Sequence, residues 1–178
     1  MKRKILVIGG AGFIGSHLVD DLVALGHEVI VYDSLEPQVH GNITKQPKYL
    51  AEDIIFIKND IRNRKALVKI LNDVEVVFHL AAMVGVAQSM YQIDKYVDVN
   101  ILGTARFLDI LVNEAHNIKK LIVASSMSTY GEGAYNCSSC GEISPKLRNI
   151  KQLEKGDWEL FCPNFTLMKM QRYLKIKF

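Results

Sequence analysis

The feature that most restricts the fold of this chain is a glycine-rich stretch at residues 9–15, which has glycine at positions 9, 10, 12 and 15. It follows an apolar run at residues 5–8 and leads into residues 16–25, where apolar residues recur three and four apart. This order predicts a strand, a tight turn and a helix. Glycines in such a turn let backbone N–H groups approach a diphosphate, and the positive end of the following helix favours its negative charge. The stretch therefore predicts a dinucleotide site, with a plain strand–turn–helix corner as the alternative.

An acidic residue in the next predicted strand indicates which dinucleotide would bind. Residues 28–32 are rich in β-branched side chains and predict a strand that ends at Asp33. Asp33 lies 18 residues beyond Gly15, near the spacing at which dinucleotide-binding folds place an acid for the adenosine ribose hydroxyls. A carboxylate there repels a 2′-phosphate, and no arginine follows directly. The sequence therefore predicts NAD rather than NADP.

Further apolar segments alternate with segments of helical periodicity. We expect strands at residues 54–57, 75–80 and 120–124, helices at residues 63–71 and 96–115, and a loop at residues 34–48. Near-continuous apolar strands that alternate with helices indicate a parallel sheet covered on both faces. The predicted fold class is therefore α/β, a Rossmann-type doubly wound parallel sheet with helices on both faces. Ligands of such sheets bind beyond the carboxyl ends of the strands. The residues at those ends are Gly9, Asp33, Asp60, Ala81 and Ser125.

Composition is ordinary for a globular protein and narrows the range of partners. The 178 residues are 49% hydrophobic and 23% charged, with a net charge of +3. From Pro145 onward eight Lys and Arg residues accompany three acids, but no nucleic-acid motif accompanies them, so we expect no nucleic-acid partner. No apolar stretch reaches transmembrane length, no signal-peptide cleavage site follows the start, and three cysteines suit a reducing compartment. We therefore expect a cytoplasmic protein without membrane contact.

Six pieces of sequence, in order along residues 5–131, resemble the extended short-chain dehydrogenase/reductase family. The pieces are Gly9-x-x-Gly12-x-x-Gly15, Asp33, Asn59-Asp60-Ile61-Arg62, His79-Leu80-Ala81-Ala82, Asn100 with Gly103-Thr104, and residues 125–131. Within that family the chain is most similar to the NAD-dependent sugar-nucleotide epimerases and dehydratases. Residues 35–41, 88–91 and 130–160 further resemble epimerases of the dTDP-L-rhamnose 4-epimerase and UDP-glucose 4-epimerase type.

The resemblance implies a cofactor-binding role for each matching residue. The residues that would hold NAD are Gly9, Gly12, Phe13, Ile14 and Gly15 at the diphosphate, Asp33 at the adenosine ribose, Asp60 and Ile61 at the adenine, Leu80, Ala81 and Ala82 beside the middle of the cofactor, and Asn100. For two of these residues a structural role is the alternative to cofactor binding. Asp60 would cap the helix that starts near residue 63, and Asn100 would hold a backbone position between a helix and a strand.

The resemblance also implies sugar-nucleotide 4-epimerisation. In the family a hydride leaves the sugar C4 for NAD and returns to the opposite face. Ser126 matches the catalytic residue that hydrogen-bonds the reacting oxygen, and its alternative role is to cap the turn after the fifth strand. The family also requires a Tyr-x-x-x-Lys pair, in which the lysine lowers the pKa of the tyrosine. That spacing occurs here only from Tyr173 to Lys177, one residue from the end, where we favour an incidental match in a basic tail.

These observations predict an NAD-binding domain at residues 1–131, followed by a Cys-containing insert and basic tail at residues 132–178, without the family's substrate-binding lobe. We expect an N-terminal fragment of an NAD-dependent 4-epimerase that acts on a dTDP- or UDP-sugar. The alternatives are a catalytically inactive NAD-binding remnant and a sugar-nucleotide dehydratase. A homodimer is compatible with the resemblance, although the sequence does not set the oligomeric state.

The three cysteines are candidate metal ligands. Cys137, Cys140 and Cys162 match three of the four positions of a zinc ribbon, but Phe165 stands at the fourth. Three thiolates without a fourth ligand bind zinc poorly as a structural site. The sequence therefore predicts no metal, with a zinc site at Cys137, Cys140 and Cys162 as the alternative.

Overall fold

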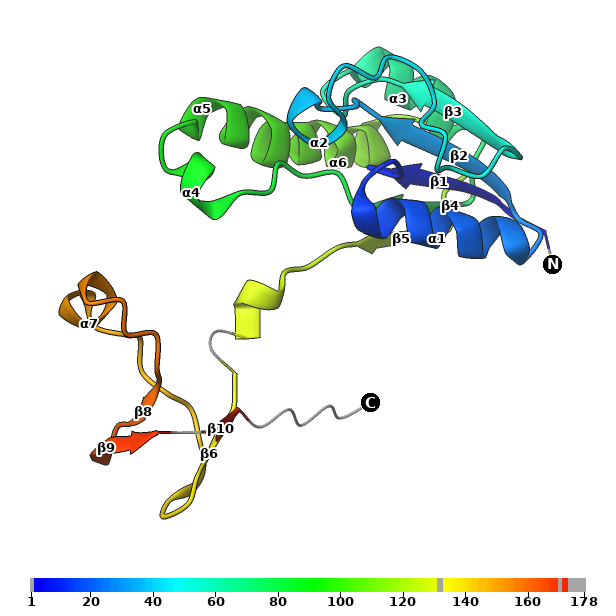
Figure 1. The fold of residues 1–178 in the computed structure, drawn as a ribbon. Helices are drawn as coiled ribbons and strands as arrows, with labels where there is room; N and C mark the ends of the chain where they lie inside the picture. Colours follow the sequence, from blue (N-terminus) through cyan, green and yellow to red (C-terminus); the bar gives the residue numbers. More distant parts are fainter. Residues whose placement is uncertain (1, 131–132, 170, 173–178) are drawn as a thin grey trace. The chain divides into compact units, whose positions relative to one another are not determined.

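The computed structural model describes residues 2–130, 133–169 and 171–172, and Figure 1 shows their fold. The chain divides into two compact units, Met1–Ala124 and Ser125–Phe178. The division at Ala124 lies seven residues before the domain boundary that the sequence predicts at residue 131.

The first unit is built on a five-stranded parallel sheet within residues 4–123. Its strands are β1 (Lys4–Ile8), β2 (Glu28–Asp33), β3 (Ile54–Lys58), β4 (Val76–His79) and β5 (Lys120–Val123), and each end lies within one residue of the predicted position. The strands pair in the order β3-β2-β1-β4-β5, and every pair is parallel. The chain thus winds from β1 to one edge of the sheet and then returns to continue from β4 to the other edge. This order confirms the predicted doubly wound sheet.

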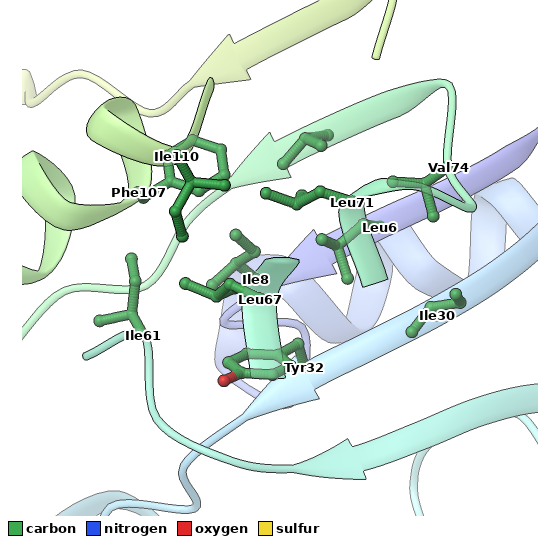
Figure 2. Close-up of a cluster of buried hydrophobic side chains, with 11 residues drawn as sticks. Leu6, Ile8, Ile30, Tyr32, Ile61, Leu67, Leu71, Val74, Phe107 and Ile110 are labelled. Carbon is green, nitrogen blue, oxygen red and sulfur yellow. The ribbon is translucent and has the colours of Figure 1, made fainter. Parts of the chain in front are cut away.

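Helices cover both faces of the sheet because successive strand residues point to opposite sides. On one face α1 (Phe13–Ala24) packs over Ile5, Val7, Val29 and Val31. On the other face, α3 (Arg64–Leu71) and α6 (Gly103–Asn113) pack over the alternate residues of the same strands. Figure 2 shows this second core, in which Leu6, Ile8, Ile30 and Tyr32 meet Leu67, Leu71, Phe107 and Ile110. Burial on both faces explains why the strand sequences are apolar almost throughout.

Two connections differ from the sequence prediction. The predicted loop at residues 34–48 contains a helical turn, α2 (Pro37–His40), because proline suits the first helical position and Gly41, at φ 61°, ends the turn. The helix predicted at residues 96–115 starts earlier, after α4 (Val86–Ser89), and is divided into α5 (Ile93–Tyr96), a π-helix (Val97–Leu102) and α6. The π-helix carries Asn100, and such turns frequently occur at functional sites.

The second unit contains short elements that the sequence did not predict. They are a 3-10 helix (Met127–Tyr130), β6 (Tyr135–Cys137), β7 (Gly141–Ile143), α7 (Ile150–Glu154), β8 (Phe161–Cys162), β9 (Phe165–Lys169) and β10 (Gln171–Arg172). β6 pairs antiparallel with β7 and β10, and β8 pairs antiparallel with β9. The predicted pair Tyr173 and Lys177 lies outside the described residues. In the parts of both units that the structure describes, no helix is long and apolar enough to span a bilayer.

Candidate cofactor site

A cavity of about 360 Å³ opens at the carboxyl ends of the strands in the first unit. It lies where β1 and β4 are neighbours and the strand order reverses, which is the place where open α/β sheets bind ligands. Eleven of the residues that the sequence assigns to the cofactor line it. These residues are Gly9, Gly12, Phe13, Ile14, Gly15, Asp33, Asp60, Ile61, Leu80, Ala81 and Ala82. The fold thus brings together segments from four strand ends around one cavity.

Three of the four glycines in the turn, the ones in the Gly-x-x-Gly-x-x-Gly motif, differ in why a side chain is absent there. Gly9 has φ 82°, and a Cβ added there would lie 2.6 Å from the backbone nitrogen of Ala81. A Cβ on Gly15 would collide with the carbonyl oxygen of Gly9 and lie 2.7 Å from the Cα of Gly10. A Cβ on Gly12, in contrast, would meet only the Gly9 carbonyl oxygen, at 3.4 Å. The fold therefore requires glycine at positions 9 and 15, whereas Gly12 keeps the cavity wall free of a side chain.

The N-terminus of α1 forms part of the same wall. Gly12 is the N-cap residue, and within the described ranges of the chain no side chain caps the helix there. The first N–H groups of a helix have no acceptor within it, and they carry the positive end of the helix dipole. Phe13 and Ile14 expose 83% and 68% of their surface, so apolar side chains stand beside these polar groups. An uncapped helix N-terminus with a glycine-lined approach fits an anionic phosphate group.

Asp33, the last residue of β2, lines the cavity and is held in place by backbone groups. Its Oδ2 accepts a hydrogen bond from the backbone N–H of Ala11 at 3.0 Å, and its Oδ1 accepts one from Leu35 at 2.8 Å. Leu35 has φ 53°, an unfavourable conformation for a branched residue, which this second bond helps to hold. Each carboxylate oxygen can accept further hydrogen bonds. The buried carboxylate is therefore oriented while it can still accept hydrogen bonds from hydroxyl groups.

Asp60 lies at the edge of the cavity and is neutralised by Arg62. Arg62 donates to Oδ1 through Nε at 2.8 Å and to Oδ2 through a terminal nitrogen at 2.7 Å, and its other terminal nitrogen bonds Asp98 at 2.6 Å. These bonds hold the pKa of Asp60 below its usual range and raise the pKa of Arg62. The capping alternative for Asp60 is wrong, because Asn63 is the N-cap of α3 and accepts from the backbone N–H of Ala66 at 3.2 Å.

Asn100 does not line the cavity, although the sequence assigned it to the cofactor site. Its Oδ1 accepts from the backbone N–H of Met83 at 2.7 Å, and its Nδ2 donates to the Met83 carbonyl at 3.1 Å. Met83, which follows the small residues after β4, does line the cavity. Asn100 therefore has the structural role that the sequence left open, because it fixes a backbone segment of the cavity wall.

Ser126, the predicted catalytic residue, belongs to the second unit. Its Oγ accepts from the backbone N–H of Ser128 at 3.1 Å, and its carbonyl accepts from Thr129 Oγ1 at 2.7 Å. These bonds organise the 3-10 turn, which is the alternative that the sequence offered. A catalytic role for Ser126 stays a prediction.

Sequence reasoning missed the part of the wall contributed by α2 and the residues around it. Glu36 and His40 both line the cavity, and Lys95 bonds Glu36 at 2.6 Å. His40 places Nε2 at 3.9 Å from Asp33 and Nδ1 at 3.2 Å from the hydroxyl of Tyr49. The available signal was the proline that follows Glu36 and the glycine that follows His40, which together suit a single helical turn.

Most of the chain matches one family of known proteins. Residues 5–148 match a family described as the NAD dependent epimerase/dehydratase family. A dTDP-L-rhamnose 4-epimerase from Burkholderia thailandensis is 34% identical over 168 residues, which cover 93% of this chain and 46% of that protein.

Two solved structures show the same similarity in three dimensions. A UDP-N-acetylglucosamine 4-epimerase from Methanobrevibacter ruminantium, in complex with UDP-N-acetylmuramic acid, has a TM-score of 0.62 and 36% identity over 75% of this chain and 41% of its own. A UDP-glucose 4-epimerase from Stenotrophomonas maltophila, with bound NAD and formylated UDP-arabinopyranose, has a TM-score of 0.61 and 28% identity over 78% of this chain and 40% of its own. This chain thus spans less than half the length of each of these three proteins.

Proposed function

We propose, since this chain belongs to the NAD-dependent epimerase/dehydratase family, that its first unit binds NAD in the cavity at the strand ends and serves sugar-nucleotide 4-epimerisation. The observation that carries the proposal is the cavity itself, where the glycine turn, Asp33 and the residues after β4 meet. The absence of a side chain at Gly12 is not explained by packing within the protein, and it fits a ligand that approaches the helix closely.

The parts of the cavity match the parts of NAD in chemical character. The uncapped N-terminus of α1 suits the diphosphate, and the fixed carboxylate of Asp33 suits the ribose hydroxyls. The negative charge of Asp33 would disfavour a 2′-phosphate, so NAD is proposed rather than NADP. Ile61 and the paired Asp60 offer an apolar and a polar contact for the adenine.

The chemistry that NAD supplies when bound is reversible hydride transfer at the sugar C4. For this chain's own residues we propose that Asn100 fixes Met83 in the cavity wall and that Ser126 donates a hydrogen bond to the reacting sugar oxygen. Proton transfer from the sugar hydroxyl would fall to the tyrosine of a Tyr-x-x-x-Lys pair, and Tyr173 with Lys177 has this spacing.

The substrate class is proposed from the relatives. One is named a dTDP-L-rhamnose 4-epimerase, and the two structures are 4-epimerases that hold UDP-linked sugars. A dTDP- or UDP-sugar is therefore the proposed substrate, and 4-epimerisation is favoured over dehydration. Assembly as a homodimer stays a prediction from the family resemblance.

The first experiment measures cofactor binding by the full chain. Isothermal titration with NAD and with NADP should give tighter binding of NAD. Equal affinity for both would contradict the role of Asp33, and no binding of either would overturn the proposal.

The second experiment measures turnover. The NAD-loaded chain is incubated separately with dTDP-L-rhamnose and UDP-glucose, and the configuration at C4 is followed by proton NMR. Turnover that Tyr173→Phe abolishes would support the epimerase. NAD binding without turnover of either sugar would instead establish the alternative, a chain that holds NAD and does not catalyse epimerisation by itself.

A further inference from the structure

The second unit brings together three thiols that are distant in sequence. Cys162 lies 22 residues after Cys140, yet their sulfur atoms are 3.6 Å apart. The sulfur of Cys137 joins them, and all three sulfurs lie within 4.8 Å of one another. Cys137 and Cys162 are each only 1% exposed. The cluster is therefore a largely enclosed group of soft ligand atoms.

Two hairpins build this cluster. Cys137 ends β6 and pairs with Gly141 at the start of β7, so Cys140 lies in the turn between the strands. Cys162 ends β8 and pairs with Phe165 at the start of β9. A spacing of three residues thus occurs in both hairpins, from Cys137 to Cys140 in the first and from Cys162 to Phe165 in the second.

The turn of the first hairpin also directs backbone donors at the cluster. The backbone N–H groups of Ser139 and Cys140 both hydrogen-bond the sulfur of Cys137. Backbone amide groups that point at a sulfur atom suit the thiolate, which is the form of cysteine that binds metals.

We propose that Cys137, Cys140 and Cys162 bind one zinc ion through their three sulfur atoms, with the fourth position taken by water. Tetrahedral zinc with Zn–S bonds of about 2.3 Å requires sulfur atoms about 3.8 Å apart, which small side-chain movements from the observed cluster supply. Thiolate ligands select zinc among the common divalent ions. Each thiol releases its proton to solvent as its sulfur coordinates zinc, and no electron is transferred.

The size of the core explains what such an ion would do. In the described part of the second unit, the buried residues of the core are Tyr135, Cys137, Leu160 and Cys162. So small an apolar core supplies little stability, and small folds of this kind commonly depend on a metal or disulfides. Zinc would hold the two hairpins together. The sequence predicted no metal because the fourth thiol is missing, but it could not show that the other three converge.

The test uses the full chain, purified with a reductant, stripped with a chelator and titrated with zinc and with cobalt. We expect one equivalent of zinc per chain and a sulfur-to-cobalt charge-transfer band in the near ultraviolet. Zinc should also release protons, up to three per chain. Cys162→Ser should weaken zinc binding at least tenfold.

Two further variants test the proposal even if Cys162→Ser does not fold: one adds a fourth thiol at the cluster, and the other adds a thiol away from it as a control. Phe165→Cys adds a thiol at the position paired with Cys162 and should tighten zinc binding at least tenfold. Ser144→Cys adds an exposed thiol just beyond β7, about 10 Å along the strand from the Cys137–Gly141 pair, and should leave zinc affinity unchanged.

The proposal would be overturned by a zinc content far below one equivalent, by a cobalt complex without the charge-transfer band, or by equal effects of Phe165→Cys and Ser144→Cys. Isolation of the chain under reducing conditions with a disulfide between Cys140 and Cys162, and without metal, would also overturn it and make the cluster a redox pair.

Discussion

The carboxylate of Asp33 and the backbone N–H of Ala11 are joined by a hydrogen bond of 3.0 Å that ties the end of β2 to the glycine turn. The same carboxylate bonds Leu35 on its other oxygen at 2.8 Å. Asp33 therefore fixes the positions of two backbone segments beside the cavity. The proposed contact with ribose would make a third use of the same group.

Asp33→Asn should weaken NAD binding by roughly 10- to 100-fold, because a hydrogen bond to a charged group contributes about 1.5–3 kcal/mol. The preference for NAD over NADP should also shrink, since the charge that repels a 2′-phosphate is gone. Titration calorimetry with both cofactors checks both effects. Asp53→Asn, which removes an exposed carboxylate near β3, is the control and should change neither affinity. An unchanged NAD affinity in Asp33→Asn would show that the carboxylate only supports the backbone.

Gly12→Ala and Gly15→Ala should have different effects, because the first should weaken NAD binding and the second should destabilise the fold. The Gly12→Ala Cβ meets only the Gly9 carbonyl oxygen, at 3.4 Å, so we expect a nearly unchanged Tm and NAD affinity at least tenfold weaker. The Gly15→Ala Cβ collides with backbone and should cost about 1–3 kcal/mol, which lowers Tm by several degrees without any ligand. Thermal unfolding with and without NAD distinguishes the two. A loss of stability in Gly12→Ala equal to that in Gly15→Ala would refute this division of roles.

Asn100→Asp should disturb the cavity wall without removing a group that lines the cavity. The carboxylate keeps the acceptor for the Met83 N–H but loses the donor to the Met83 carbonyl and repels that oxygen. We expect a stability loss of about 1–3 kcal/mol and weaker NAD binding. Urea unfolding and titration calorimetry measure these effects. Asn42→Asp, at an exposed position after α2, is the control and should behave as the unchanged protein.

The strands and most cavity residues could be predicted because their signals are local. A parallel strand buried on both faces is an apolar run, and ligand-binding residues of this fold follow directly at the strand ends. Asp33 at the end of β2 is an example, since one strand and one spacing suffice to locate it.

The parts that the sequence did not predict depend on tertiary contacts or on very short elements. Asn100 acts on Met83 across 17 residues of chain, and no spacing rule shows which backbone group its amide will meet. In α2, proline and glycine mark a loop and a helical turn equally well, so the contribution of His40 to the wall was missed. The strands of the second unit have two to five residues, which is too short for a periodic pattern to emerge.

His79 should make the stability of the first unit fall as the pH drops below about 6.5. It is 4% exposed, its Nδ1 has no hydrogen-bond partner among the residues that the structure describes, and burial lowers its pKa. Below the ordinary histidine pKa of about 6.5, the unfolded chain therefore binds more protons than the folded one, and stability declines until the pH reaches the folded pKa. Asp60 affects stability only in a separate, more acidic pH range, because the hydrogen bonds from Arg62 lower its pKa below the ordinary value of an aspartate. Urea unfolding midpoints between about pH 5 and 7.5 measure the effect. His79→Gln should make stability less dependent on pH in this range. His17→Gln, at an exposed position, is the control and should leave the pH dependence unchanged. Equal pH dependence of stability in the two variants would assign the effect to other groups.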